Sequence, residues 1–153
     1  MEVINILFMV LFGLNVVTWN LTGIMSSAMH LSEVLNEGNI DICGLSEHWL
    51  SKSNVHFIDS VCADFNHVTV CSNNGCRNRN IGKGGVSIMW RKKYDNLITP
   101  LNIDDDRIVG IQLQVSPGQY MFFFQVYLPC SNYSIDMYND YMYKLYDLFF
   151  YVL

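Results

Sequence analysis

The sequence has few charged residues and no overall excess of basic ones. Only 15% of its 153 residues are charged, and the formal net charge is −5, whereas roughly a quarter is typical of globular domains. The 51% hydrophobic content excludes a disordered chain, because such chains carry too little apolar surface to form a core. The acidic balance excludes a global basic field that would attract nucleic acid or anionic lipid, and leaves only a local basic patch open.

The sequence also lacks a C-x-x-C pair. It has five cysteines, an odd number, and Cys71 and Cys76 are the only close pair. A zinc site needs about four ligands at suitable spacing, which this pattern does not supply. We therefore expect free thiols in a reducing compartment, with Cys43 and Cys130 in or near the core. The sequence has no repeat, linker or low-complexity segment, and its length predicts one domain.

A long uninterrupted apolar run is missing as well. Residues 1–13 are strongly apolar, but Glu2 and nearby asparagines interrupt the run before it reaches the ~18 residues of a membrane span. A secretory signal would begin with a basic region, whereas this chain begins Met-Glu. We expect an apolar N-terminal extension, residues 1–13, that leads into a buried strand. A signal anchor is the alternative, in which the sequons at Asn20 and Asn132 would matter.

The next part of the sequence changes its periodicity twice. Leu14–Asn20 and Ile40–Leu45 are apolar and strand-like, while Ser26–Glu37 has apolar residues at helical spacing. Gly38 follows as the residue expected just after a helix end. A strand, a helix and a strand of these lengths predict a βαβ crossover with two parallel, adjacent strands.

The second half of the sequence predicts a hairpin and a helix. Residues 71–85 are rich in Asn and Gly and are expected to form an exposed loop before the strand "GVSIMW". The strands "RIVGIQLQV" and "YMFFFQVYLP" flank the turn "SPGQ" and predict a β-hairpin. Residues 135–150 predict a helix whose apolar stripe needs a sheet to cover it. Trp19 and Trp49 are expected in the core rather than stacked on bases.

Polar residues stand at the ends of three predicted strands. Asn20 ends the first strand and Glu47 ends the second, so parallel strands would bring both to one carboxyl edge, where sites form in α/β folds. Amide and carboxylate oxygens suit Mg²⁺. Tyr127 ends the last strand, where its phenol could donate a hydrogen bond to a phosphate. Spacing alone favours ordinary roles for all three: a turn former, a solvated strand end and a residue at the core rim.

Five segments in order resemble a known family. They are "VVTWNLTG", "DICGLSEHWL", "GKGGVSIMWRKK", "DDDRIVGIQL" and "VYLPCSN". From about Leu14 to Phe150 the chain resembles the N-terminal half of the endonuclease/exonuclease/phosphatase superfamily. It looks most like the reverse-transcriptase-associated endonuclease domains of LINE-type retrotransposons, which are similar to apurinic/apyrimidinic endonucleases and deoxyribonuclease I. The resemblance implies an α/β (α+β) fold, a partial, truncated four-layered sandwich of the deoxyribonuclease I-like type over residues 14–153.

The resemblance also implies an activity and its residues. It implies hydrolysis of DNA phosphodiesters with Mg²⁺ or Mn²⁺, and assigns Glu47 and Asn20 to the metal. Asn20, Glu47 and Tyr127 would form the catalytic group, and Tyr127 with Arg107 would bind substrate. Thr22 stands where apurinic endonucleases often have Asp. The implied partner is DNA, in the nucleus or cytoplasm, with no small-molecule cofactor and no specific protein partner.

The later motifs of that family are missing from this sequence. Neither D-x-N nor a terminal Ser-Asp-His follows Tyr127, and all 4 histidines lie upstream of it. His48 is expected to be structural, because it stands beside the metal carboxylate rather than opposite it. We expect half of a catalytic site in an incomplete, inactive fragment derived from a retrotransposon. The alternatives are a non-catalytic remnant that binds nucleic acid weakly or not at all, and a membrane-anchored or secreted protein.

Overall fold

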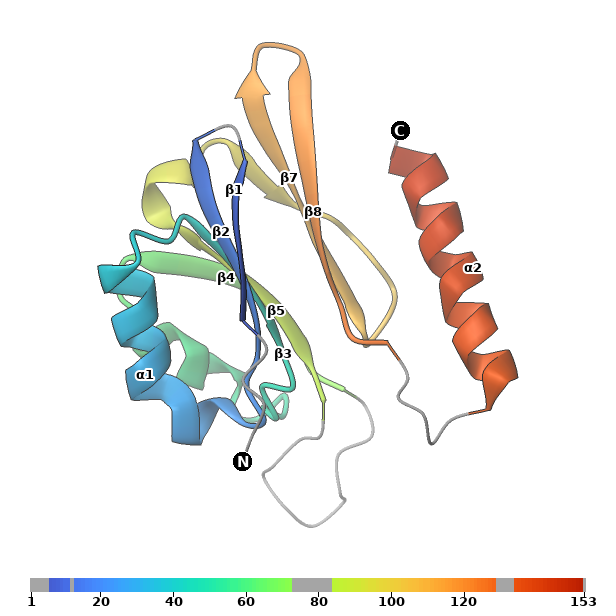
Figure 1. Ribbon diagram of the computed structural model, residues 1–153, viewed down its shortest axis with the longest axis horizontal. Helices are drawn as coiled ribbons and strands as arrows, with labels where there is room; N and C mark the ends of the chain where they lie inside the picture. Colours follow the sequence, from blue (N-terminus) through green and yellow to red (C-terminus); the bar gives the residue numbers. More distant parts are fainter. Residues whose placement is uncertain (1–5, 12, 73–83, 129–133, 153) are drawn as a thin grey trace.

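Two β-sheets lie face to face between two helices in a computed structural model of the chain (Figure 1). The structure describes residues 6–11, 13–72, 84–128 and 134–152. Sheet A has the strand order β1 (Ile6–Leu11), β2 (Leu14–Asn20), β3 (Ile42–Ser46), β5 (Val86–Arg91) and β4 (Phe65–Val70). Sheet B has the order β6 (Ile98–Pro100), β7 (Ile108–Ser116) and β8 (Gln119–Val126). The helices are α1 (Ile24–Glu37) and α2 (Ile135–Val152), with short 3-10 turns η1 (Val55–Ser60) and η2 (Lys92–Tyr94).

The predicted βαβ unit is confirmed. Strands β2 and β3 are parallel neighbours, with Asn20 opposite Ser46 at their carboxyl ends. Helix α1 connects them and begins at Ile24, two residues before the predicted start, because its first N–H groups find carbonyl partners in the segment after β3. The helix ends at Glu37 as predicted, but Gly38 keeps a right-handed conformation and Asn39, with φ 48°, takes the left-handed one.

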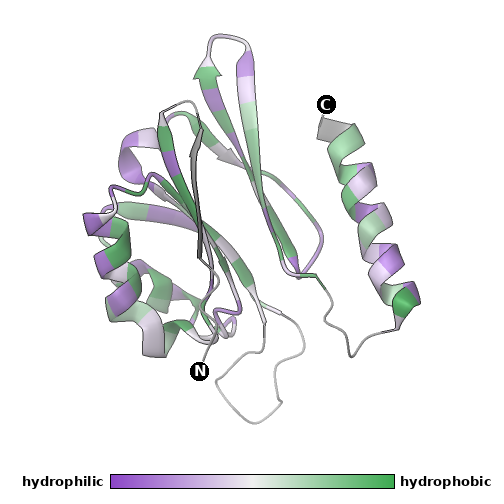
Figure 2. Cartoon of the chain, in the orientation of Figure 1, coloured by the Kyte–Doolittle hydropathy of each residue, from purple (hydrophilic) through white to green (hydrophobic). Residues whose placement is uncertain are grey.

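Alternating side chains of sheet A fill two separate cores. Val17, Trp19 and Leu45 point toward α1, where they pack with its buried leucines Leu31 and Leu35. The intervening residues point to sheet B: Ile42, Val86, Ile88 and Trp90 pack against Val109, Ile111 and Leu113. This period of two follows from the strand pleat. The layers are therefore α1, sheet A, sheet B and α2, and Figure 2 shows hydrophobic residues in both sheets and in both helices.

Helix α2 covers the outer face of sheet B. Leu145 is buried there, and the ring of Phe149 meets Phe124 of β8 edge to face at 5.6 Å between centroids. The sheet that the apolar stripe of this helix requires is thus sheet B. None of the helices within the described ranges is long and apolar enough to cross a membrane.

The structure confirms some of the other predictions and adds strands that the sequence does not predict. The β7–β8 hairpin is confirmed, with Gly118 at φ 76° in its turn. Strands β1 and β4 were not predicted, and β1 lies within the expected extension, antiparallel to β2. Cys43 is a buried free thiol as expected, and its burial raises its pKa. Cys130 and most of the expected loop, residues 73–83, lie outside the described residues.

Candidate functional site

The last residue of β3 and the three that follow it, residues 46–49, are fixed from two sides, and we call them the site loop. Its carbonyls accept hydrogen bonds from the β2–α1 turn: Leu21 N to Ser46 O at 3.0 Å, Gly23 N to Glu47 O at 2.8 Å and Ile24 N to His48 O at 3.0 Å. Its N–H groups donate to the start of β5: Glu47 N to Gly85 O at 2.9 Å and Trp49 N to Gly84 O at 3.0 Å. The β2–α1 turn and β5 therefore set the position of each side chain in the loop.

The same region concentrates backbone strain. Within the described residues, four that are not glycine have positive φ, and three of them lie here: Thr22 at 47°, Glu47 at 56° and Trp49 at 57°. Left-handed conformations of such residues cost about 1–3 kcal/mol each and persist only where the surroundings enforce them. Gly84 and Gly85, at φ 74° and 85°, supply the matching turn on the β5 side. Strain of this kind gathers at functional sites, which makes this edge the leading candidate.

Asn20 and Glu47 meet at this edge. The Asn20 side-chain Nδ2 donates to Glu47 Oε1 at 2.9 Å, and its Oδ1 accepts the backbone N–H of Thr22 at 3.3 Å. Both side chains are half-buried. The amide therefore restrains the carboxylate. Coordination of a metal by Asn20 Oδ1 stays a prediction.

His48 is buried behind the site loop and is held by the backbone. Its Nε2 lies 3.1 Å from Val70 O, and its Nδ1 accepts the backbone N–H of Leu50 at 2.9 Å, so Nε2 carries the proton. Burial disfavours the charged ring and lowers the pKa of His48, although carbonyls of Val70 and Val86 oppose the shift. With both nitrogens engaged, His48 is a structural residue, as expected, and not a general base.

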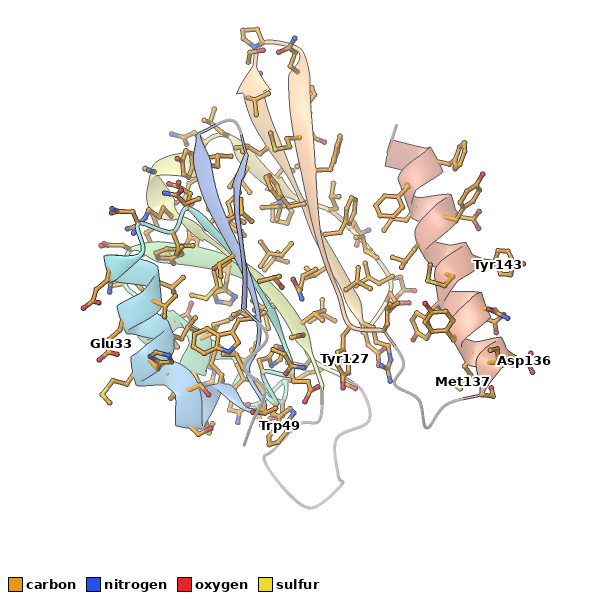
Figure 3. The ribbon with its side chains drawn as sticks, viewed as in Figure 1. Glu33, Trp49, Tyr127, Asp136, Met137 and Tyr143 are labelled. Atoms are coloured by element: carbon orange, nitrogen blue, oxygen red, sulfur yellow. The ribbon has the colours of Figure 1, made fainter. Side chains whose placement is uncertain are left out.

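Tyr127 and Arg107 lie together near the same edge. The Tyr127 ring is 3.7 Å from the position that a Cβ would take on Gly84, whose carbonyl accepts Trp49 N–H. Figure 3 shows Tyr127 and Trp49 at the same end of the sandwich. Arg107 Nη1 donates to Tyr127 O at 3.4 Å, and its guanidinium lies 5.4 Å from the centre of the Tyr127 ring. In this arrangement Arg107 braces Tyr127.

The expectation that Trp49 belongs to the core is wrong. Trp49 is 37% exposed, whereas Trp19 is 3% exposed as expected. The cause is local geometry: the left-handed backbone turns the indole over Gly23, where a ring carbon lies 3.0 Å from the position of a Cβ. No pattern in the sequence signals a positive φ at a tryptophan, because this residue type rarely adopts it.

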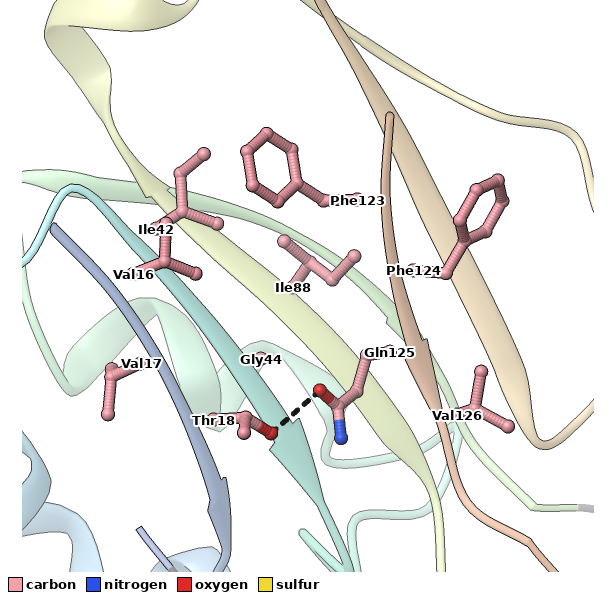
Figure 4. A pocket seen from close by; sticks show the side chains of 10 residues that line it. All are labelled: Val16, Val17, Thr18, Ile42, Gly44, Ile88, Phe123, Phe124, Gln125 and Val126. Atoms are coloured by element: carbon pink, nitrogen blue, oxygen red, sulfur yellow. Dashed lines mark hydrogen bonds between the residues drawn. The ribbon is translucent and has the colours of Figure 1, made fainter. Parts of the chain in front are cut away.

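A mainly apolar hollow lies between the two sheets. It has a volume of about 350 Å³ and is lined mainly by aliphatic and phenyl groups of β2, β3, β5 and β8. Its polar contact is the Thr18 hydroxyl, which donates to Gln125 Oε1 at 3.0 Å (Figure 4). No titratable side chain lines it, so it offers no acid or base for catalysis.

Among the described residues, the site edge offers a single carboxylate, that of Glu47, to a metal ion. Across the described ranges, no three His, Cys, Asp or Glu side chains gather closely enough to hold a metal ion. Mg²⁺ is commonly held by one or two carboxylates together with waters and substrate phosphates. Because Glu47 is one carboxylate, a metal held here would take its other ligands from waters and a bound phosphate.

Two solved structures are similar to the chain to different degrees. An AP endonuclease from Leishmania major matches with a TM-score of 0.60 and 14% identity, over 74% of this chain and 40% of that one. An AP endonuclease from Archaeoglobus fulgidus matches with a TM-score of 0.47 and 18% identity, over 65% of this chain and 37% of that one. No family model and no curated protein sequence matches the chain.

The Leishmania match confirms the fold class that the sequence predicts. The chain has a mixed α/β fold of the deoxyribonuclease I-like type, with two facing sheets and few helices. It spans about 40% of the length of that AP endonuclease.

Proposed function

We propose that the chain carries the metal-binding half of a phosphodiesterase site that acts on DNA. The observation that carries this proposal is the Asn20–Glu47 pair, held at 2.9 Å at the carboxyl edge of two parallel strands. The strained site loop and the fold shared with an AP endonuclease support it. The structural neighbour from Leishmania major is an AP endonuclease, which makes DNA the substrate to test.

Each residue has a distinct role in this proposal. Glu47 binds Mg²⁺ or Mn²⁺, and Asn20 keeps the carboxylate in place by donating to Oε1. A metal bound there would polarise the phosphate and stabilise the leaving oxygen. The Tyr127 phenol donates a hydrogen bond to a phosphate oxygen, and Arg107 holds Tyr127 through its carbonyl and ring.

The chain by itself is proposed to be inactive. General acid–base catalysis contributes typically about 10²–10⁴-fold, and the histidine nearest to Glu47 has both nitrogens bonded to the backbone. The motifs that would orient the attacking water do not follow Tyr127 in the sequence. We also propose a retrotransposon origin of the LINE type. The genomic reading frame after Leu153 tests the truncation, since a D-x-N and a Ser-Asp-His there would make this chain a truncated gene model.

Metal binding tests the proposal apart from activity. We expect Mn²⁺ to bind the purified chain, measured by electron paramagnetic resonance of the free ion, and to lose affinity in Glu47→Gln. Glu33→Gln is the matched control, because Glu33 lies on the exposed face of α1. Equal Mn²⁺ binding by Glu47→Gln and the parent chain would rule out the site.

Plasmid nicking with Mg²⁺ or Mn²⁺ tests the inactivity. We expect no nicking above the level of Glu47→Gln. Nicking by the parent chain that disappears in Glu47→Gln would show that this half of the site is sufficient, and the proposed inactivity would be wrong.

A further inference from the structure

We propose that Trp49 is a stacking platform for an unpaired DNA base beside the phosphodiester held at Asn20 and Glu47. This inference rests on the proposed function and adds the form of DNA that the site prefers. It assigns a substrate contact to a residue that the sequence places in the core.

The position of Trp49 is fixed relative to Glu47. Only His48 stands between them in the chain, so their Cα atoms are at most ~7 Å apart. Both donate backbone hydrogen bonds to the residues just before β5, Glu47 to Gly85 and Trp49 to Gly84. A nucleotide whose phosphate lies at Glu47 thus has its base within reach of the indole. The Tyr127 ring lies beside Gly84, whose carbonyl accepts the Trp49 N–H, so Tyr127 also borders this edge.

The indole packs against Gly23 and is in part reached by solvent. Gly23 lies against the ring, with a Cβ position only 3.0 Å from a ring carbon, so a larger residue at position 23 would displace the ring. Trp49 is 37% exposed, so part of its side chain is available to a ligand. Helix α1 starts directly after Gly23, and the Gly23 N–H donates to Glu47 O, so the residue that supports the ring is held in place.

The chemistry of an exposed indole favours an unstacked base. Stacking between an aromatic side chain and a base needs a free base face, which single strands offer and an intact duplex does not. The net charge of −5 gives little general attraction to the phosphate backbone. A stacking contact would therefore account for a large part of the affinity for a short strand.

Tryptophan fluorescence provides a direct test. Trp19 and Trp90 are 3% and 6% exposed, so Trp49 is the tryptophan that a quencher in solution reaches. The probes are a short oligothymidylate, the same sequence in a duplex, and an abasic sugar-phosphate strand of equal charge, each with Mg²⁺. We expect the oligothymidylate to quench the emission and the other two to leave it nearly unchanged.

Variants of Trp49 measure how much stacking contributes to the affinity for oligothymidylate. We expect Trp49→Ala to weaken binding of the oligothymidylate by roughly 5- to 150-fold, the effect of removing one stacked base. Trp49→Phe keeps an aromatic face and should retain most of the affinity. Neither variant should change Mn²⁺ binding, since the Asn20–Glu47 contact does not involve the indole.

The outcomes separate this inference from the proposed function. Equal affinity of Trp49→Ala and the parent chain, with Mn²⁺ bound at Glu47, would overturn the stacking role and leave the metal site standing. Quenching by the abasic strand as strong as that by oligothymidylate would overturn it as well. Failure of every strand to bind would overturn both proposals.

Discussion

The close approach of Gly85 to His48 shows how single residues shape the site loop. A Cβ on Gly85 would lie 2.3 Å from the imidazole, and the backbone there has φ 85°. We predict that Gly85→Ala lowers the free energy of unfolding by about 2–4 kcal/mol, through backbone strain and displacement of a buried ring. Urea denaturation followed by circular dichroism measures this change.

Gly118→Ala is the matched control. Gly118 has φ 76°, nearly that of Gly85, but its Cβ position has open space around it. This variant should cost about 1 kcal/mol, from the backbone alone. Equal losses in the two variants would show that the His48 contact contributes nothing.

The buried ring of His48 also predicts a pH dependence. Burial lowers its pKa in the folded state, so the unfolded chain binds more protons near its ordinary value of about 6.5. Stability should therefore be lost as pH falls, between about pH 7.5 and 5.5. The difference between urea midpoints at these two pH values should shrink in His48→Gln, and an unchanged difference would assign the effect to other groups.

At the residue scale, the sequence predicts the positions of side chains that follow from the pairing of strands. Asn20 and Glu47 come to one edge because β2 and β3 are parallel, and the spacing on either side of α1 predicts that. It fails at Trp49, whose exposure depends on a left-handed backbone that hydrogen bonds from distant segments enforce. Tryptophan is a large and mostly apolar side chain, so residue type alone points to the core.

At the scale of elements, helix α2 has fewer buried residues than α1: one among residues 135–150, against three in α1. Leu145 is its buried apolar contact, and Lys144 pairs with Asp105 at 3.1 Å through an exposed lysine. We predict that Leu145→Ala detaches α2 and speeds hydrogen exchange over residues 135–152, while β2 and β3 keep their protection. Met142→Ala, at an exposed position of the same helix, should leave exchange unchanged. Equal exchange in both variants would contradict this account of α2.

The elements differ in how well the sequence predicts them. Strands β7 and β8 flank a clear turn, and α2 has a long helical stripe, so both are readable from pattern. Strand β4 (Phe65–Val70) contains Asn66 and His67 and gains its place by pairing with β5, a contact between residues about twenty positions apart. Strand β1 is a short apolar run, and periodicity alone does not separate a strand from other buried segments there.

The molecule as a whole presents an aromatic surface on the outer face of α2. Tyr143 and Phe150 are 71% and 67% exposed, and Tyr146 packs against Phe150 with ring centroids 4.6 Å apart. Contiguous exposed apolar surface favours association. We predict concentration-dependent self-association in sedimentation velocity, reduced in the double variant Tyr143→Lys and Phe150→Lys.

Tyr120→Lys is the control for that experiment. Tyr120 is also exposed, but it lies on β8 near the hairpin turn and away from the outer face of α2. If Tyr120→Lys dissolves the assembly as well as the α2 variant does, association is not specific to α2.

The two-sided anchoring of the site loop has a consequence for the order of assembly. Its bonds join residues 21–24, 46–49 and 84–85, so the loop acquires its shape only when β5 has docked beside β3. Closing the intervening chain of nearly forty residues costs entropy before these bonds form. Metal affinity at Glu47 would then report the completed sheet, and by mass action a bound ion would favour that state over partly assembled ones. Metal binding and completion of sheet A would thus be thermodynamically coupled.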